Sequence, residues 1–293
     1  MRPMNQSIRC LALFAAMLAP RLSAQDAAVA PERIHIIGAS VSGGFVDGPL
    51  FGAEEKGDSV SLHRVLKKWC DGEVKVTTHP PMQMWSLFRD PVEIGGQELA
   101  LAKRRKPDAV VAVDFLFWFA YGYVGRDPER QRPARFEQGL ALLDQLKVPL
   151  IVGDLPDMRG AATRMLRPRQ IPSVEMLEKL NARLVDWAEQ REGIDVVPLS
   201  KLIRELKVDG TSLPLADGAL RTAPLALLQG DRLHATRLGM AFLTFRLQRS
   251  LQHLFPKAHA LHGHQWSFEQ LVEAAGAEEE LEELRANAGK AGR

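Results

Sequence analysis

The chain has 293 residues, of which 46% are apolar and 25% are charged, so it is long enough to bury a full core in one large domain or two modest ones. Its 38 basic and 36 acidic residues leave a net charge of +2, and this balance does not favour nucleic acid or an anionic membrane surface as a partner. The composition is also unlike that of a disordered or fibrous protein.

The first 24 residues have the layout of a secretory signal peptide. Two arginines flank the start of an apolar run over 10–19, and Ser23 and Ala24 supply the small residues of a cleavage point. The run is well short of the roughly 20 residues of a membrane-spanning helix, so an uncleaved anchor is the weaker alternative and no stable membrane insertion is expected. We expect cleavage after Ala24, a linker over 25–32, and export to the periplasm or the extracellular space.

The rest of the chain alternates strand and helix patterns, with no internal repeat or linker. Strands are predicted at 33–38, 73–78, 109–113, 149–153 and 195–199, and helices at 62–69, 97–103, 135–146, 174–191, 200–206 and 237–254. This alternation predicts an α/β fold over 33–256, a three-layer α/β/α arrangement with a doubly wound, parallel, five-stranded sheet. The segment 209–228 is predicted to be a loop, and the polar tail over 257–293 to be helical or disordered.

The first strand runs into a turn of small residues that carries a serine, Gly38-Ala39-Ser40-Val41-Ser42. Glycine lets the backbone turn sharply at the carboxyl edge of the sheet, where open α/β sheets bind their ligands. Such a turn is either a plain strand-to-helix connection or the position of a nucleophile. Only a partner from elsewhere in the chain distinguishes the two.

Asp231 and His234 stand three residues apart, immediately before the last predicted helix. At this spacing the carboxylate can accept a hydrogen bond from one ring nitrogen while the other nitrogen faces a serine. In isolation the pair is also explained by helix capping and an ordinary surface histidine.

Together the two segments resemble the first and last sequence blocks of the SGNH hydrolases, also called GDSL esterases and lipases, although Ala39 replaces the aspartate of the first block. The resemblance covers roughly 33–255 and implies an SGNH or flavodoxin-like fold. It implies that Ser40 is the nucleophile, that His234 is the general base and that Asp231 orients the histidine. It further implies hydrolysis of an ester through an acyl-enzyme, with a small-molecule or glycan ester as substrate and with no cofactor and no metal.

The third block of the family supplies an asparagine as an oxyanion donor, and this chain has Asp114 to Trp118 at that position, without an asparagine. The resemblance implies that the backbone N–H groups of Ser40 and of Gly95 or Gly96, which match the glycine of the second block, supply donors instead. The indole N–H of Trp118 is a third candidate.

Two other functions remain open from the sequence. One is a non-catalytic SGNH-like protein that binds a carbohydrate or other ligand in the cleft. The reason is that a carboxylate at Asp114, near the oxyanion-binding site, would oppose a developing oxyanion. A phosphate or nucleotide binder that uses 38–44 is the other, although this turn lacks the Gly-x-Gly-x-x-Gly spacing and the lysine of a P-loop. An adventitious metal site at His259, His262 and His264 lacks an accompanying carboxylate or cysteine set.

Overall fold

The computed structural model describes residues 30–45, 60–123 and 125–291. The predicted signal peptide lies outside these ranges, as does most of the predicted linker. Within the described ranges, no helix has both the length and the apolar character needed to cross a bilayer.

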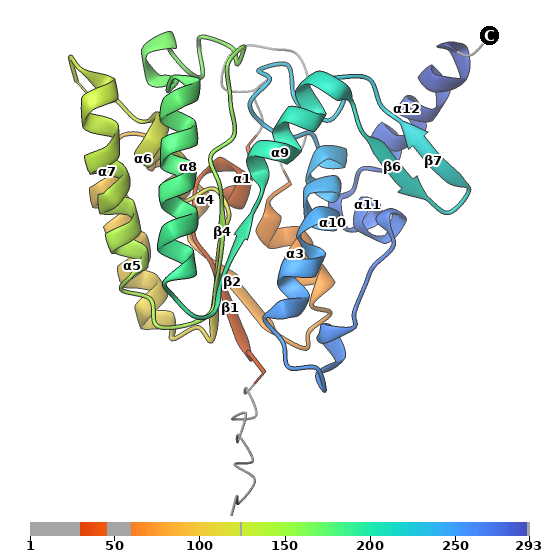
Figure 1. Ribbon diagram of the computed structural model, residues 1–293. Coiled ribbons are helices and arrows are strands. Elements are labelled where there is room, and N and C mark those ends of the chain that lie inside the picture. Colours follow the sequence, from red (N-terminus) through yellow and green to blue (C-terminus); the bar gives the residue numbers. More distant parts are fainter. Residues whose placement is uncertain (1–29, 46–59, 124, 292–293) are drawn as a thin grey trace, which may run out of the picture.

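A five-stranded, fully parallel sheet forms the centre of the molecule, in the order β2-β1-β3-β4-β5 (Figure 1). The strands are β1 (Arg33–Ile36), β2 (Lys75–Thr78), β3 (Ala109–Ala112), β4 (Leu150–Gly153) and β5 (Ile194–Val197). Each strand falls within or next to a predicted one, and the order is that of a doubly wound, flavodoxin-like sheet. The predicted fold class is therefore confirmed.

Helices cover both faces of the sheet (Figure 1). One face carries α3 (Leu62–Trp69), α9 (Leu199–Arg204) and α10 (Arg237–His253), and the other carries α5 (Pro91–Arg105), α7 (Pro128–Leu143) and α8 (Val174–Glu189). Because side chains alternate along a strand, Ile34 and Ile36 enter the first core while Ile37 enters the second. All four residues of β3 are buried, which explains its unbroken apolar sequence.

Several elements differ from the prediction. The helix α5 begins at Pro91, because the Asp90 side chain caps it by accepting hydrogen bonds from the N–H groups of Val92 and Glu93. Short elements that periodicity did not predict are α1 (Ser40–Gly43), α4 (Pro81–Ser86), α6 (Phe117–Tyr121), the 3₁₀ turns η1 (Pro168–Gln170) and η3 (Ala260–His262), and the π-helical turn η2 (Glu205–Asp209). The predicted loop over 209–228 contains an antiparallel hairpin, β6 (Ser212–Leu215) and β7 (Gly218–Arg221).

The segment that follows residue 256 contains helices that pack against the rest of the domain. The helix α11 (Phe268–Ala275) buries Phe268 and Leu271 in the core next to α10 and α3, and α12 (Glu278–Ala291) follows it. The Glu280 carboxylate of α12 accepts a hydrogen bond from the N–H of Leu238 at 2.9 Å, at the start of α10. The acidic composition of the tail hid this role, because the few apolar residues that carry the packing are outnumbered by exposed glutamates.

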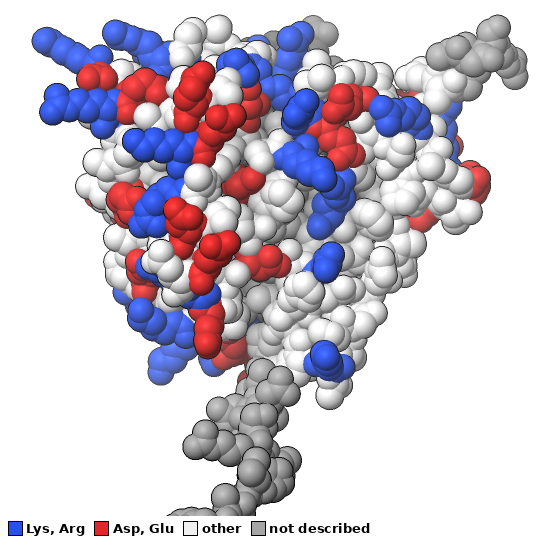
Figure 2. Space-filling view, viewed as in Figure 1, with Lys and Arg blue, Asp and Glu red and all other residues white. Residues whose placement is uncertain are grey.

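The surface over α7 and α8 mixes acidic and basic side chains without a block of one sign (Figure 2). Two ion pairs join this side of the molecule, Arg183 with Glu137 at 2.7 Å and Arg191 with Asp144 at 2.5 Å. Exposed pairs of this kind contribute at most about 1 kcal/mol each. The cores on the two faces of the sheet therefore dominate the stability of the fold.

Candidate active site

Ser40 begins α1, directly beyond the carboxyl end of β1. In this strand order the crevice for ligands lies outside the ends of β1 and β3. The turn requires glycine at Gly38, because its φ of 146° disfavours a side chain and an added Cβ would collide with the Asp114 carboxylate. The small-residue turn therefore places Ser40 at the crevice.

The structure brings Ser40, His234 and Asp231 into one chain of hydrogen bonds. His234 Nε2 lies 2.8 Å from Ser40 Oγ, and His234 Nδ1 lies 2.6 Å from Asp231 Oδ2. With the ring proton on Nδ1, the serine hydroxyl donates to the histidine and the histidine donates to the carboxylate. In this order of groups the histidine can take the serine proton while the carboxylate holds the ring in place.

The loop before α10 orients the Asp231 carboxylate for its contact with His234. Its Oδ1 accepts hydrogen bonds from the N–H groups of Leu233 at 2.9 Å and His234 at 3.0 Å, which leaves Oδ2 for the imidazole. Burial alone raises the pKa of Asp231, but the hydrogen bonds and the charge of His234 outweigh it and hold the pKa below its ordinary value. Thr236 then caps α10 through the N–H of Gly239 at 3.0 Å and ends the loop.

Asp114 does not act in the way that the sequence suggested. Its Oδ1 accepts from the N–H of Ala39 and the hydroxyl of Ser42, at 3.0 and 2.6 Å. Its Oδ2 accepts from the N–H groups of Val41 and Ser42, at 2.8 and 3.3 Å. Both oxygens are thus engaged by the turn that carries Ser40, and the carboxylate supports this turn from behind. Asp114 therefore has a role in positioning the serine turn that the sequence did not reveal.

A second buried carboxyl group, on Glu98 of α5, holds the residue before that turn. Its Oε2 accepts the N–H of Gly38 at 2.9 Å, and its Oε1 has no hydrogen-bond partner. Burial raises the pKa of Glu98 well above its ordinary value, and the nearby charge of Asp114 raises it further. Sequence reasoning missed Glu98, because a glutamate in a helix is normally a solvent-exposed residue.

Gly95 and Gly96 do not lie where the resemblance implied. Both are in the second turn of α5, where N–H groups bond to carbonyls of the preceding turn. A Cβ added to Gly95 would contact Phe115 and Phe119 in the core, and neither glycine lines a space that reaches Ser40. We therefore correct this assignment: the N–H groups of both glycines lie within α5, Gly95 packs against the core, and neither glycine lines a space beside Ser40 where an oxyanion would form.

Two other N–H groups fit the role better. The backbone N–H of Ser40 has no acceptor in the described part of the chain, although those of Ala39 and Val41 on either side do. The indole of Trp118 lines the same open cleft as Ser40, and its N–H makes no hydrogen bond to any described residue. Both N–H groups are thus without a partner among the described residues, and both belong to residues that line the cleft.

Two spaces meet at Ser40 and His234. The first is an apolar cavity of about 80 Å³ under the strand ends, walled mainly by α9, α10 and the loop before α10. The second is an open cleft of about 600 Å³. Its lining residues are Ser40, Phe45, Trp85, Ser86, Phe88, Arg89, Trp118, Tyr123, Arg164, Met165, Arg167, Gln170, Leu233 and His234. The position of the serine between a small apolar cavity and a much larger cleft suits a substrate with two dissimilar halves.

No protein-family model and no curated protein matches the chain. Among solved structures, similar ones include a gut microbial diltiazem-metabolizing enzyme, at 9% identity and a TM-score of 0.45 over 75% of this chain. The match spans 46% of the length of that enzyme. An acetyl xylan esterase is similar at 14% identity and a TM-score of 0.43, over 75% of this chain and 99% of its own. A Desulfitobacterium hafniense protein, described as lipolytic and of the G-D-S-L family, is similar at 12% identity and a TM-score of 0.36, over 66% of this chain and 91% of its own.

Proposed function

We propose that this protein is a carboxylic ester hydrolase of the SGNH type, with Ser40 as nucleophile, His234 as general base and Asp231 as the residue that orients the histidine. The observation that carries the proposal is the continuous contact from Ser40 Oγ to His234 at 2.8 Å and from His234 to Asp231 at 2.6 Å. Residues 194 positions apart in sequence meet here at hydrogen-bonding distance, in the order that activates a hydroxyl group.

In the first half of the reaction, Ser40 Oγ attacks the ester carbonyl carbon while its proton moves to His234 Nε2. The carbonyl oxygen becomes an oxyanion, which the N–H of Ser40 and the indole N–H of Trp118 stabilise. The tetrahedral intermediate then collapses: the bond to the alcohol oxygen breaks, and His234 gives its proton to the departing alcohol. The acyl group remains on Ser40 as an ester.

In the second half, a water molecule loses a proton to His234 and attacks the acyl carbon. The second tetrahedral intermediate releases Ser40, which recovers its proton from the histidine, and the products are the carboxylic acid and the alcohol. Asp231 keeps its negative charge throughout and compensates the charge of the imidazolium ion, in agreement with its lowered pKa.

The apolar cavity limits the acyl group of the substrate. A cavity of about 150 Å³ holds one benzene molecule of six carbons, so about 80 Å³ corresponds to roughly three carbons. Apart from the polar groups of the site itself, residues such as Leu202, Ile203 and Leu243 make its wall. Acetyl and propionyl are therefore the acyl groups that fit.

The proposal includes export. The N-terminal pattern, with its apolar run over 10–19 and cleavage after Ala24, supports a periplasmic or extracellular location. Mass spectrometry of the protein from that compartment is expected to find a mature chain that begins at Gln25. A chain that starts at Met1 and remains with the cytosol would contradict export and leave the catalytic assignment intact.

The test of the catalytic assignment is Ser40→Ala, assayed beside the wild type on 4-nitrophenyl acetate. Loss of the nucleophile is expected to lower kcat on the order of 10⁴-fold or more, because the serine and histidine of a triad act as a unit. Ser267→Ala is the matched control, since it removes a hydroxyl that caps α11 on the far side of α10. Equal turnover by Ser40→Ala and the wild type would overturn the proposal, as would failure of a fluorophosphonate probe to label Ser40.

A further inference from the structure

The open cleft beside Ser40 is walled by aromatic rings. The Phe45 ring stacks on His234 at 4.1 Å between ring centroids, and Trp85 meets Phe45 edge to face at 5.8 Å. Phe88 and Trp118 form a second pair at 5.8 Å. Rings in two pairs offer flat apolar surfaces on which a planar or ring-shaped group can stack.

In the described part of the chain, the charged residues that line the cleft are all of one sign. Of the described residues that line it, three are arginines and none is acidic. Arg89 and Arg167 are exposed, and neither forms an ion pair with a carboxylate of the described chain. Arginine presents a planar fork of donors that fits a carboxylate in two parallel hydrogen bonds, so the cleft is suited to an anionic group.

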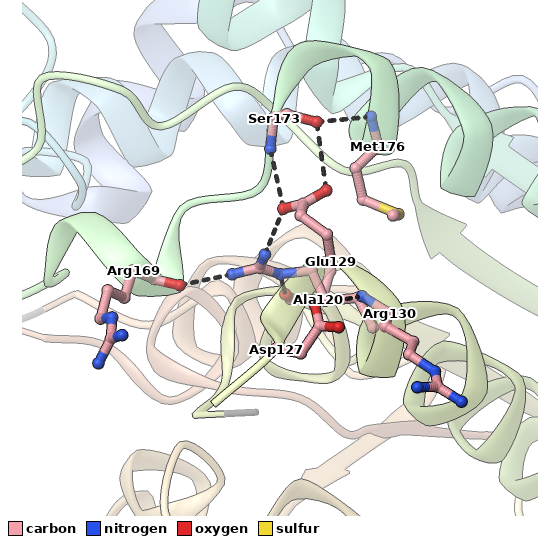
Figure 3. Close-up of polar contacts among 8 residues, drawn as sticks. Ala120, Asp127, Glu129, Arg130, Arg169, Ser173 and Met176 are labelled. Carbon is pink, nitrogen blue, oxygen red and sulfur yellow. Dashed lines mark hydrogen bonds and ion pairs between the residues drawn. The ribbon is translucent and has the colours of Figure 1, made fainter. Parts of the chain in front are cut away.

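The part of the wall near Arg167 is held in place by a network around one buried arginine. Arg132 of α7 is 1% exposed and donates to the carbonyl oxygens of Ala120 and Arg169, both at 2.8 Å. It also pairs with Glu129 at 2.6 Å, and Glu129 in turn accepts from the hydroxyl of Ser173 at 3.2 Å. Figure 3 shows Glu129 and the Arg169 carbonyl turned toward this network from different segments.

This network fixes the segment that carries Arg167. The side chain of Gln170 accepts the backbone N–H of Arg167 at 3.0 Å and donates to the carbonyl of Tyr121 at 3.4 Å. The segment is thereby tied to α6, which also carries Trp118. Because the backbone that carries Arg167 is ordered before binding, it loses little conformational entropy when a ligand arrives.

We propose that the cleft binds the alcohol half of the substrate and that this alcohol is a ring that bears a carboxylate. The inference rests on the proposed ester hydrolysis at Ser40. The short acyl group occupies the apolar cavity, the ring of the alcohol stacks on the aromatic wall, and its carboxylate pairs with Arg89 and Arg167. An aromatic acid and a sugar acid share this chemistry.

The first test compares 4-acetoxybenzoate with its neutral methyl ester. The two have the same acetyl group and the same ring, and the methyl ester has the better leaving group, so chemistry alone favours the neutral compound. We expect the wild type to hydrolyse the anion with a kcat/KM about tenfold higher, through a lower KM. We also expect this preference to shrink as the salt concentration rises, because screening weakens the ion pairs.

The second test uses Arg89→Gln, Arg167→Gln and the double variant, with Arg64→Gln on the exposed face of α3 as a control of equal charge change. The two cleft variants are expected to lower the ratio of anion to neutral kcat/KM, and the double variant to bring it near or below one. Arg64→Gln is expected to keep the wild-type ratio. A wild-type ratio of one or less in both this aryl pair and the sugar-acid pair below, or a ratio that only Arg64→Gln alters, would overturn the inference.

A second pair of substrates distinguishes an aromatic acid from a sugar acid. It consists of the methyl glycoside of O-acetylated glucuronic acid and the neutral methyl ester of that compound. Preference for the anion in the sugar pair alone identifies a sugar acid, and preference in the aryl pair alone identifies an aromatic acid; either supports the inference. Hydrolysis of the neutral esters that depends on Ser40, without any preference for the anions, would overturn the inference and leave the proposed function standing. No hydrolysis of any ester would remove both.

Discussion

Two buried aspartates flank Ser40, and they differ in what they hold. Asp231 lies on the histidine side, in the loop before α10, and accepts the imidazole Nδ1–H at 2.6 Å. Asp114 lies on the opposite side, beyond β3, and accepts four hydrogen bonds from the turn that carries the serine. One carboxylate therefore touches the base, and the other accepts only from neutral groups of Ala39, Val41 and Ser42, the neighbours of the nucleophile.

The pKa values of the two aspartates shift in opposite directions. Burial raises the pKa of both carboxyl groups. In Asp231 the hydrogen bonds and charge of His234 reverse that effect, whereas the neutral donors around Asp114 do not, so the pKa of Asp114 stays above its ordinary value. We infer from this difference that Asp231 interacts with the positive charge that develops on His234 during the reaction, whereas Asp114 positions the serine.

The largest effect expected from this comparison is that of Asp231→Asn. An asparagine at this position can present its amide N–H₂ to the histidine and favour the wrong ring tautomer, which costs about 10⁴-fold in kcat in a comparable triad. We expect a loss of 10³- to 10⁴-fold in kcat on 4-nitrophenyl acetate, with little change in KM. Steady-state kinetics with active-site titration measures it.

Arg232→Gln is the matched control for this loss, because it changes the neighbouring residue of the same loop. Its exposed side chain lies outside the contact between Asp231 and His234, so a rate close to that of the wild type is expected. A loss of less than tenfold in Asp231→Asn would contradict the assignment of Asp231 as the residue that orients the base.

A smaller effect is expected from Asp114→Asn. Asparagine offers one acceptor oxygen in place of two, so at least one of the donors from Ala39, Val41 and Ser42 is left facing an N–H₂ group. A shift of Ser40 by about 1 Å can cost about 10²-fold in rate. We expect kcat to fall by 10- to 100-fold, and the rate of fluorophosphonate labelling per active site to fall with it.

The labelling rate separates positioning from simple loss of folded protein, since unfolding lowers the number of reactive sites and not their individual rate. Asp108→Asn is the control: Asp108 accepts the N–H groups of Glu32 and Arg33, at 3.0 and 2.9 Å, at the other end of the same strand. Unchanged labelling kinetics in Asp114→Asn would show that the carboxylate is dispensable for placing the serine.

The sheet and part of the site could be predicted from the sequence, because local sequence patterns reflect these parts of the structure. Apolar runs such as Ala109–Ala112 mark buried strands, and the spacing of Asp231 and His234 already implied a shared contact. The Ser40 turn was recognisable because glycine is required at Gly38, where a side chain would collide with Asp114. These features depend on neighbours in sequence or on backbone conformation, and both can be inferred from residue types.

The features that the sequence did not predict depend on contacts between distant segments. Gly95 and Gly96 matched a family position by order alone, yet the cap at Asp90 extends α5 over both. Asp114 was expected to oppose an oxyanion, because nothing in its local sequence reveals that the turn at 39–42 uses both its oxygens. The packing of Phe268 against α10 was likewise hidden by the acidic residues that follow it.

The smallest effect on activity is expected from Glu98→Gln. Unlike the other variants, this one is expected to be more stable than the wild type. In the folded protein the pKa of Glu98 is raised well above its ordinary value, mainly by burial. Between the ordinary pKa and the raised one the folded state therefore binds more protons than the unfolded state, so stability falls as the pH rises through this window, by about 1.4 kcal/mol for each pH unit. Glutamine cannot ionise and keeps an acceptor for the N–H of Gly38.

Glu98→Gln is thus expected to match the wild type in melting temperature near pH 4 and to exceed it by a growing margin toward pH 9, with kcat within about twofold near neutral pH. Glu93→Gln, an exposed residue of the same helix, controls for the general effect of removing a carboxylate from α5. A variant that is less stable than the wild type at every pH, and slower at pH 7, would mean that the charge of Glu98 is needed to hold Gly38. Glu98 would then join Asp114 as a support of the serine turn, and two ionised carboxylates would share that role.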